Sequence, residues 1–292
     1  MTKTAWVFPG QGSQSVGMGI DLLNLPSAKK RFNQAQDILG WSVTDICQGD
    51  EEKLSHTLYT QPCLYVVETI LADLLREKGQ KPDLVAGHSL GEYVALYVAG
   101  VFEWSAGLQV VKRRAELMDN AAGGKMAALM KFDREQLEQA IAENPDVVLA
   151  NDNSPAQVVI SGTPTAVEKI ISEVKTKRAT TLNVSGAFHS PLMAAAATEF
   201  QDVLELVNFR SASIPVLSNV EPVPETDGET LKARVIKQMT GSVRWREISL
   251  ALPKQGIERV VEIGPGKVLT GLLKRTCEGL NLANISTAAN LE

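Results

Sequence analysis

The chain has 292 residues, enough for one large α/β domain or for such a domain with a smaller one inserted. Hydrophobic residues make up 44% and charged residues 22%, as in an ordinary globular protein. The net charge of −5 argues against a general nucleic-acid binder. The N-terminal segment lacks the apolar core of a signal peptide, and no apolar run reaches transmembrane length, so we expect no membrane partner.

Three cysteines stand far apart in the chain, at Cys47, Cys63 and Cys277. They are odd in number and show neither a metal-binding spacing nor a disulfide framework. Cysteines of this kind suit a reducing compartment, so we expect a cytoplasmic protein.

The first third of the chain is typical of an α/β protein. Residues 4–8 predict a buried strand that ends in the glycine-rich loop PGQGSQ. The elements expected next are helices at about 27–39 and 61–78, the latter begun by Gln61-Pro62, a strand at 83–86 and helices at 92–99 and 104–120.

From residue 124 the pattern changes to a compact β-α-β-β-α-β order, which is the ferredoxin-like pattern. Its expected elements lie at 125–132, 133–143, 146–153, 156–162, 163–175 and 179–184. We therefore predict a ferredoxin-like subdomain at 124–186, inserted between core segments 1–123 and 187–292. The second core segment carries expected helices at 190–206 and 230–239, and expected strands at 214–220 and 259–264.

The stretch Gly87-His88-Ser89-Leu90-Gly91 matches the G-x-S-x-G nucleophile elbow. This motif requires a strand before it and a helix after it, and residues 83–86 and 92–99 supply both. The two glycines remove the Cβ atoms that would crowd so sharp a turn. We expect Ser89 to be a nucleophile presented at a helix N-terminus, where the helix dipole favours a developing anion.

A serine nucleophile needs a base, and the chain has three histidines. His88 lies within the elbow and should point away from the serine oxygen, which favours a structural role. His56 lies in a polar stretch and should be exposed. His189 lies in a loop before a helix, in GAFHSP, and is the expected base.

The third member of a catalytic triad is not evident. Asp133, Glu143 and Asp152 fall between the serine and the histidine, the order of an α/β-hydrolase, but all three belong to the inserted subdomain. A main-chain carbonyl that accepts the Nδ1–H group is the alternative, because it also fixes the imidazole tautomer.

Seven segments together resemble the malonyl-CoA:acyl-carrier-protein transacylases and the related acyltransferase domains of polyketide synthases. They cover the chain in order: FPGQGSQ at 8–14, QPCLYVV at 61–67, GHSLGEYVAL at 87–96, VVKRRAELM at 110–118, NSPAQVVISG at 153–162, GAFHSPLM at 186–193 and EIGPGKVLTGLLKR at 262–275. The resemblance implies an α/β-hydrolase-like core, with a parallel sheet and a ferredoxin-like insert.

The resemblance also implies roles for individual residues. Ser89 is the nucleophile and His189 the base, while the main-chain amides of Gln11 and Leu90 form the oxyanion hole. A phosphate cradle is the weaker interpretation of PGQGSQ, because no GK[ST] follows. The carbonyl that orients the base falls on Gln238, whose side chain is then expected to be free to vary.

Substrate contacts follow in the same way. The resemblance places the free carboxylate of malonate on Arg114, whose planar guanidinium can donate two parallel hydrogen bonds. Phe188, before the base, accompanies malonyl use because it would crowd a substituent at C2. Asn153 is expected to bind substrate as well. No metal and no cofactor are implied.

The implied reaction loads malonyl from malonyl-CoA onto the serine and then transfers it to the phosphopantetheine thiol of acyl carrier protein, for fatty-acid synthesis. Because that carrier is acidic, docking needs a local basic patch. The candidates are Lys175, Lys177 and Arg178, or Lys267, Lys274 and Arg275, although either cluster equally fits a solvated surface. A serine hydrolase and a non-catalytic carrier-binding subunit are the alternative functions.

Overall fold

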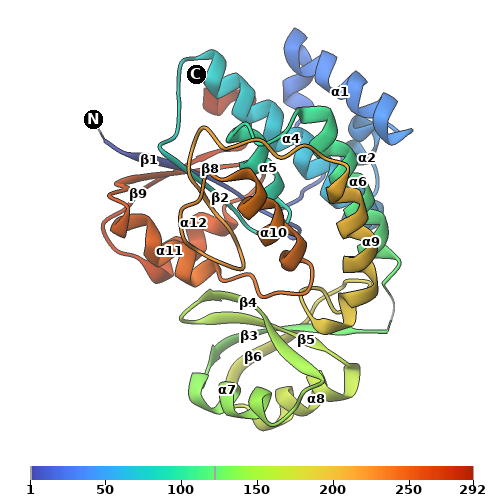
Figure 1. Cartoon of the computed structure of the whole chain (residues 1–292), viewed down its shortest axis with the longest axis vertical. Helices are drawn as coiled ribbons and strands as arrows, with labels where there is room; N and C mark the ends of the chain where they lie inside the picture. The colour runs from blue at the N-terminus through green and yellow to red at the C-terminus, as the bar shows by residue number, and fades with distance from the viewer. Residues whose placement is uncertain (1, 122, 292) are drawn as a thin grey trace.

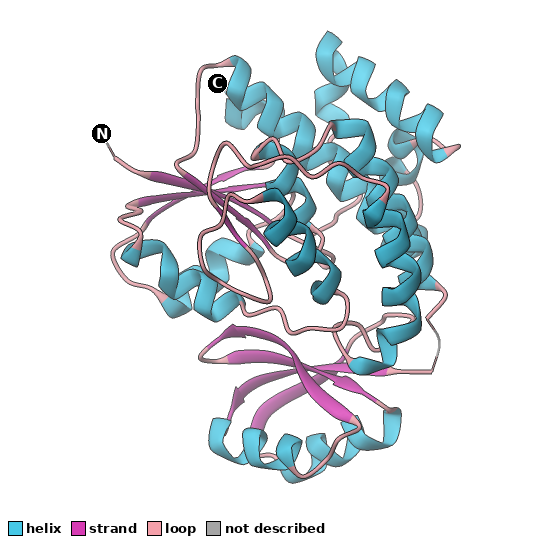
Figure 2. Cartoon of the chain, in the orientation of Figure 1, coloured by secondary structure: helices cyan, strands magenta, loops and turns pink. Residues whose placement is uncertain are grey.

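The computed structural model describes residues 2–121 and 123–291. Two units are visible in Figures 1 and 2, each built on one sheet. The larger unit contains a five-stranded parallel sheet, and the smaller a four-stranded antiparallel sheet. Within the described ranges, no helix is both long and apolar enough to cross a membrane.

The parallel sheet has the strand order β7-β2-β1-β8-β9. Its strands are β1 (Thr4–Phe8), β2 (Leu84–Gly87), β7 (Val216–Leu217), β8 (Arg259–Ile263) and β9 (Asn281–Ile285). Successive side chains of β1 face opposite sides: Trp6 and Phe8 join one hydrophobic core, Ala5 and Val7 another. Both faces are therefore covered, which explains the apolar strands seen in the sequence.

Helices cover the two faces of this sheet in layers. The core around Trp6 packs against α1 (Pro26–Leu39), α2 (Val43–Gln48), α4 (Thr57–Glu77), α5 (Gly91–Val98), α6 (Trp104–Asp119), α9 (Ala194–Glu205) and α10 (Gly228–Gln238). The core around Ala5 packs against α11 (Trp245–Lys254) and α12 (Val268–Thr276). A short helix α3 (Glu51–Ser55) and the 3₁₀ turns η1 (Ile20–Asn24), η2 (Pro191–Met193) and η3 (Ala288–Leu291) complete this unit.

The smaller unit has the β-α-β-β-α-β order that the sequence predicts. Its elements are β3 (Lys125–Phe132), α7 (Arg134–Ala142), β4 (Val147–Ser154), β5 (Gln157–Gly162), α8 (Pro164–Glu173) and β6 (Thr176–Thr181), with strand order β4-β5-β3-β6. The two helices lie on the sheet face turned away from the larger unit (Figure 1). They bury Leu137, Val167 and Ile170 against that face, so this unit has its own core.

Strand β4 of the smaller unit makes hydrogen bonds and an ion pair with the larger unit. The N–H of Asp152 donates to the carbonyl of Val243 at 3.0 Å, and the N–H of Val243 donates to the carbonyl of Ala150 at 2.8 Å. The carboxylate of Asp152 also pairs with Arg246 at the start of α11, at 2.8 Å. These contacts fix the smaller sheet against the edge of the larger unit.

Several elements differ from the sequence expectations. Helix α4 begins at Thr57 and contains Pro62, whereas the sequence predicted that it begins at Gln61-Pro62. The hydroxyl of Thr60 donates to the carbonyls of Leu54 and His56, which ties the first turn of α4 to the end of α3. Strand β6 spans 176–181 because pairing with β3 sets its register, Thr181 opposite Ala127. The expected strand at 214–220 is reduced to two residues. Periodicity did not reveal α2, α3, α11, α12 or β9.

Candidate active site

The nucleophile lies in the turn between β2 and α5. Ser89 has a φ of 52°, in the left-handed region that non-glycine residues rarely adopt. A Cβ on Gly87 would lie 1.9 Å from the carbonyl carbon of Gly91, and a Cβ on Gly91 would lie 2.0 Å from the Phe8 oxygen. Backbone crossings this tight exclude any side chain, so both glycines are required by close approach.

His189 approaches the nucleophile from the loop before η2, and its own φ is 56°. Its Nε2 lies 2.8 Å from Ser89 Oγ. Its Nδ1 lies 2.9 Å from the main-chain oxygen of Gln238 and 3.2 Å from that of Gly241. Because carbonyl oxygens only accept, the proton belongs on Nδ1, and Nε2 keeps a lone pair for the serine proton.

The imidazole of His189 is held neutral. Burial, followed by the nearby positive charge of Arg114, lowers the pKa of His189 to about 3. Both causes disfavour the charged imidazolium. At neutral pH the ring is therefore ready to take a proton.

The other two histidines have different surroundings. His88 Nε2 lies 2.8 Å from Asn153 Oδ1, and its ring packs against Trp245. Burial lowers the pKa of His88. The side chain of His56 is 60% exposed, 3.9 Å from Asp119. Neither ring contacts the serine oxygen.

The three carboxylates considered for a triad are engaged with other partners. Asp152 pairs with Arg134 and Arg246. Asp133 caps α7 by accepting the N–H of Gln136, and Glu143 accepts from Gln139 in the same helix. The main-chain oxygens of Gln238 and Gly241 occupy the place that an acid would take beside the base.

Arg114 projects from α6 beneath the nucleophile and is completely buried. Its Nη1 donates to Gln61 Oε1 at 2.7 Å, and its Nη2 donates to Ser89 Oγ and to Gln238 Oε1, both at 3.0 Å. All three acceptors are neutral, and burial lowers the pKa of Arg114. Gln61, which sequence reasoning did not single out, lay within the QPCLYVV segment.

The expectation that the Gln238 side chain is free to vary is wrong. Its amide is fully buried, accepts from Arg114 and donates through Nε2 to Glu92 Oε2 at 2.7 Å and to the Ser89 carbonyl at 3.0 Å. One amide thus links the Arg114 guanidinium, the Glu92 carboxyl group and the nucleophile turn. The sequence could not show this, since the three contacts come from α5, α6 and the turn at Ser89, all distant in the chain from Gln238.

A cavity of about 80 Å³ opens beside the serine. It is lined by Gln11, Gln61, His88, Ser89, Leu90, Arg114, Met118, Met126, Asn151, Leu182, Val184, Phe188 and His189. Asn153 does not line it; its neighbour Asn151 does, with an Oδ1 that is buried and has no partner among the described residues. Register shifts in β4 on either side of Asp152 accompany this placement.

Gln11 and Leu90, whose main-chain N–H groups are the expected oxyanion donors, both line the same cavity. Neither of these two main-chain N–H groups donates a hydrogen bond to an acceptor within residues 2–121 and 123–291. The loop that contains Gly10 packs closely against the elbow that contains His88. A Cβ on Gly10 would lie 2.4 Å from the main-chain oxygen of His88. The glycine at position 10 therefore lets the first loop reach the elbow.

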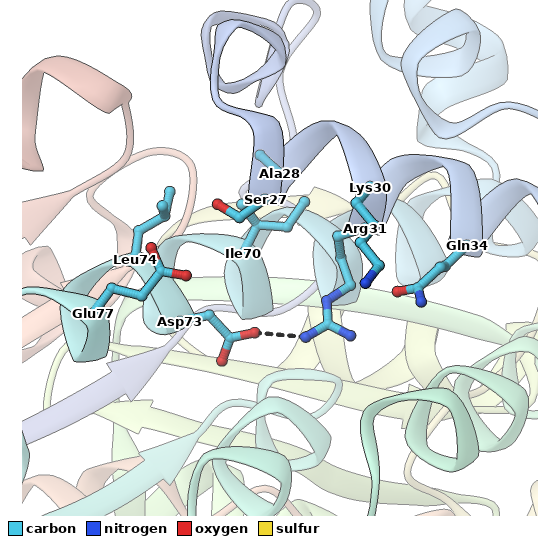
Figure 3. Close-up of a pocket in the computed structure, with 9 residues that line it drawn as sticks. All are labelled: Ser27, Ala28, Lys30, Arg31, Gln34, Ile70, Asp73, Leu74 and Glu77. Carbon is cyan, nitrogen blue, oxygen red and sulfur yellow. Dashed lines mark hydrogen bonds and ion pairs between the residues drawn. The ribbon is translucent and has the colours of Figure 1, made fainter.

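A separate hollow of about 220 Å³ lies between α1 and α4 (Figure 3). Arg31 and Asp73 pair across it at 2.9 Å. Its lining residues are Ser27, Ala28, Lys30, Arg31, Gln34, Ile70, Asp73, Leu74 and Glu77. These residues include no histidine that could serve as a base, whereas Ser89 and His189 both line the smaller cavity.

The chain belongs to the acyl transferase domain family, whose sequence profile matches residues 5–291. It is 61% identical over 289 residues to the malonyl CoA-acyl carrier protein transacylase of Synechocystis, covering 99% of each chain. It is 44% identical over 278 residues to a polyketide biosynthesis malonyl CoA-acyl carrier protein transacylase of Bacillus subtilis, covering 92% of this chain and 96% of that one.

Solved structures agree with this assignment. The crystal structure of the Synechocystis transacylase superimposes with a TM-score of 0.98 at 61% identity, covering 99% of both chains. A malonyl-transacylase in complex with a type II polyketide acyl-carrier protein gives a TM-score of 0.94 at 38% identity, covering 99% of this chain and 98% of that one. The resemblance to the malonyl-CoA:acyl-carrier-protein transacylases is therefore confirmed.

Proposed function

We propose that this protein transfers the malonyl group of malonyl-CoA to the phosphopantetheine thiol of an acyl carrier protein, through a malonyl-serine intermediate, and so supplies fatty-acid synthesis. One observation carries the proposal. Ser89 Oγ lies 2.8 Å from the base His189 and 3.0 Å from the buried cation Arg114. The proposed nucleophile, base and carboxylate receptor thus meet in one cavity. The names of the relatives, which are malonyl transacylases of acyl carrier proteins, supply the substrates of the proposal.

In the first half of the reaction, Ser89 Oγ attacks the thioester carbonyl carbon and its proton passes to His189 Nε2. The carbonyl oxygen becomes an oxyanion, which the N–H groups of Gln11 and Leu90 stabilise. The C–S bond then breaks, and the leaving sulfur of coenzyme A takes the proton from His189. Malonyl remains on the serine as an ester.

In the second half, the phosphopantetheine thiol gives its proton to His189 and its sulfur attacks the ester carbon. The C–O bond to Ser89 breaks, and the serine oxygen recovers the proton. The carbonyl oxygens of Gln238 and Gly241 hold the ring in one tautomer throughout.

Three residues govern the choice of acyl group in this proposal. Arg114 binds the free carboxylate with two parallel hydrogen bonds, which a lysine cannot copy. Phe188 is buried at the cavity wall and limits the space for a substituent at C2. Asn153 acts indirectly, because its amide holds the His88 ring that lines the cavity.

We propose the following architecture for this activity. Residues 1–123 and 187–292 form an α/β-hydrolase-like core, supported by the strand–turn–helix around Ser89. Residues 124–186 form a ferredoxin-like subdomain, supported by its element order and by its separate hydrophobic core. The cytoplasm remains the proposed compartment on the cysteine argument, and all three thiols are free.

For docking of the acidic carrier we favour the cluster of Lys267, Lys274 and Arg275. All three are exposed on or beside α12. A Cβ on the preceding Gly266 would lie 3.5 Å from the Ser13 oxygen, so Lys267 adjoins the loop that carries Gln11. Lys175, Lys177 and Arg178 are also exposed but belong to the opposite edge of the smaller sheet, at β6.

Brief incubation with malonyl-CoA alone tests the function. Intact-mass spectrometry should show one added malonyl group, absent from Ser89→Ala. Addition of a phosphopantetheinylated carrier should move the label to the carrier rather than release free malonate. Release of free malonate at the same rate with and without carrier would support a serine hydrolase instead. An adduct that persists in Ser89→Ala would refute the assignment of the nucleophile.

A further inference from the structure

The hydrogen bonds of Arg114 leave little room for a substrate carboxylate. Nη2 carries two hydrogens and already donates two hydrogen bonds, one to Ser89 Oγ and one to Gln238 Oε1. Nη1 donates one, to Gln61. Nε has no partner among the described residues.

A carboxylate can take two parallel hydrogen bonds from a guanidinium in only two ways. The end-on pair uses Nη1 and Nη2, and the side-on pair uses Nε and Nη2, the terminal nitrogen on the side of the Nε hydrogen. Both pairs include Nη2. A bidentate substrate carboxylate must therefore displace either Gln238 or Ser89 from Arg114.

The bond to Gln238 is the more firmly held. The amide of Gln238 is fully buried, and its nitrogen is fixed by Glu92 Oε2 at 2.7 Å and by the Ser89 carbonyl at 3.0 Å. Ser89 Oγ, in contrast, turns about a single bond at the edge of the cavity. The hydroxyl is thus the partner that Arg114 gives up.

We propose that Arg114 restrains Ser89 in the empty enzyme, and that the free carboxylate of the acyl group releases the nucleophile by taking Nη2 for itself. This inference rests on the proposed function and adds a regulatory role to the substrate receptor. While Arg114 donates to Oγ, a cation occupies one lone pair of the attacking oxygen and draws electron density from it. Once a carboxylate holds Nη2, that lone pair is available to the thioester carbon while the proton still passes to His189.

The consequence is discrimination in the chemical step as well as in binding. An acetyl group has no carboxylate, so it meets a serine that Arg114 still holds. After acylation the serine oxygen is part of an ester and a poor acceptor, so nothing competes with the malonyl carboxylate for the guanidinium. A charge-assisted hydrogen bond is strong enough to change a rate on the order of 10-fold.

A carboxylate supplied separately tests this coupling. The rate at which acetyl-CoA acetylates Ser89 is measured by intact mass in a single turnover, with sodium formate or with sodium chloride at equal ionic strength. Formate should raise the rate several-fold in a saturable manner, while chloride and the neutral analogue formamide should not. Arg114→Met, which keeps an apolar stem, should react faster than the parent without formate and should not respond to it. Arg113→Ala should behave as the parent.

The proposal is overturned if formate leaves the parent rate unchanged or lowers it, or if it accelerates Arg114→Met equally. If that variant does not fold, the comparison of formate with formamide in the parent still decides. Failure here is separate from failure of the proposed function, because malonyl loading and transfer are measured without formate.

Discussion

The side-chain oxygen of Asn219 accepts the main-chain N–H of Ser89 at 2.7 Å. The nitrogen of the same amide donates to the carbonyl of Gly87 at 2.6 Å, and Asn219 is fully buried. One side chain therefore spans the turn from Gly87, the first residue of the motif, to the nucleophile itself. A left-handed serine costs about 1–3 kcal/mol and persists only where its surroundings hold it.

Asn219→Ala should slow acylation of Ser89 by malonyl-CoA and by acetyl-CoA by the same factor, because the turn loosens without any change in the carboxylate receptor. The free energy of unfolding should fall by about 1–3 kcal/mol, since a buried N–H loses its acceptor. Labelling rates and chemical denaturation measure the two effects. Asn208→Ala, at an exposed position, should change stability by less than about 0.5 kcal/mol. Unchanged labelling with reduced stability would mean that Asn219 only supports the fold.

His189→Ala should lower turnover by about 10²–10⁴-fold through loss of the general base alone. His88→Ala should act mainly on stability, because His88 bonds Asn153 and packs on Trp245 without touching the serine oxygen. Steady-state kinetics and thermal unfolding of both variants separate the two roles. A well-folded, inactive His88→Ala beside an active His189→Ala would reverse the assignment.

Arg114→Ala should sharply reduce kcat/KM for malonyl-CoA without reducing it for acetyl-CoA, since only malonyl loses a bidentate partner. The loss for malonyl should be roughly 10- to 150-fold or more, the range of a charge-assisted pair. Arg114→Lys should restore little, because an ammonium lacks the planar fork. Arg113→Ala is the control, since Arg113 instead pairs with Glu116 and Glu199. Equal losses for both substrates would make Arg114 a structural residue.

The rate of acylation should begin to fall only at an unusually low pH. With a pKa of about 3, His189 stays neutral where an ordinary histidine, near 6.5, would be protonated. Acetylation of Ser89 should therefore hold steady between about pH 7 and pH 5. Because the charge of Arg114 helps to lower this pKa, Arg114→Ala should move the acid limb to higher pH. An acid limb near pH 6.5 in the parent, unmoved in the variant, would contradict this account.

Carrier docking can be separated from loading, because malonyl-CoA loads the serine before the carrier arrives. Lys267→Glu with Arg275→Glu should raise the KM for the acidic carrier and leave the loading rate with malonyl-CoA unchanged. The effect should shrink at high salt, where exposed charges are screened. Lys175→Glu with Lys177→Glu, at the start of β6, is the matched control. If only that pair impairs transfer, the docking face is the other edge of the smaller sheet.

The sequence by itself determined the local features of this protein. The strand before Ser89, the two glycines and the helix after it lie in one continuous stretch, so apolar patterning and glycine spacing predict them together. The mixed α/β class and the β-α-β-β-α-β order of the smaller unit were predicted for the same reason. Each depends on contacts between residues near in the chain, which periodicity reports directly.

Only the tertiary structure decided the partners of the site. Asn219, Gln61 and the Gln238 amide contact the nucleophile turn or the arginine from elements distant in the sequence. Likewise, β6 takes its register from pairing with β3 and not from its own polar residues. A hydrogen bond between distant side chains exists only after helices and loops have packed, and no periodic pattern encodes which buried donor will meet which acceptor.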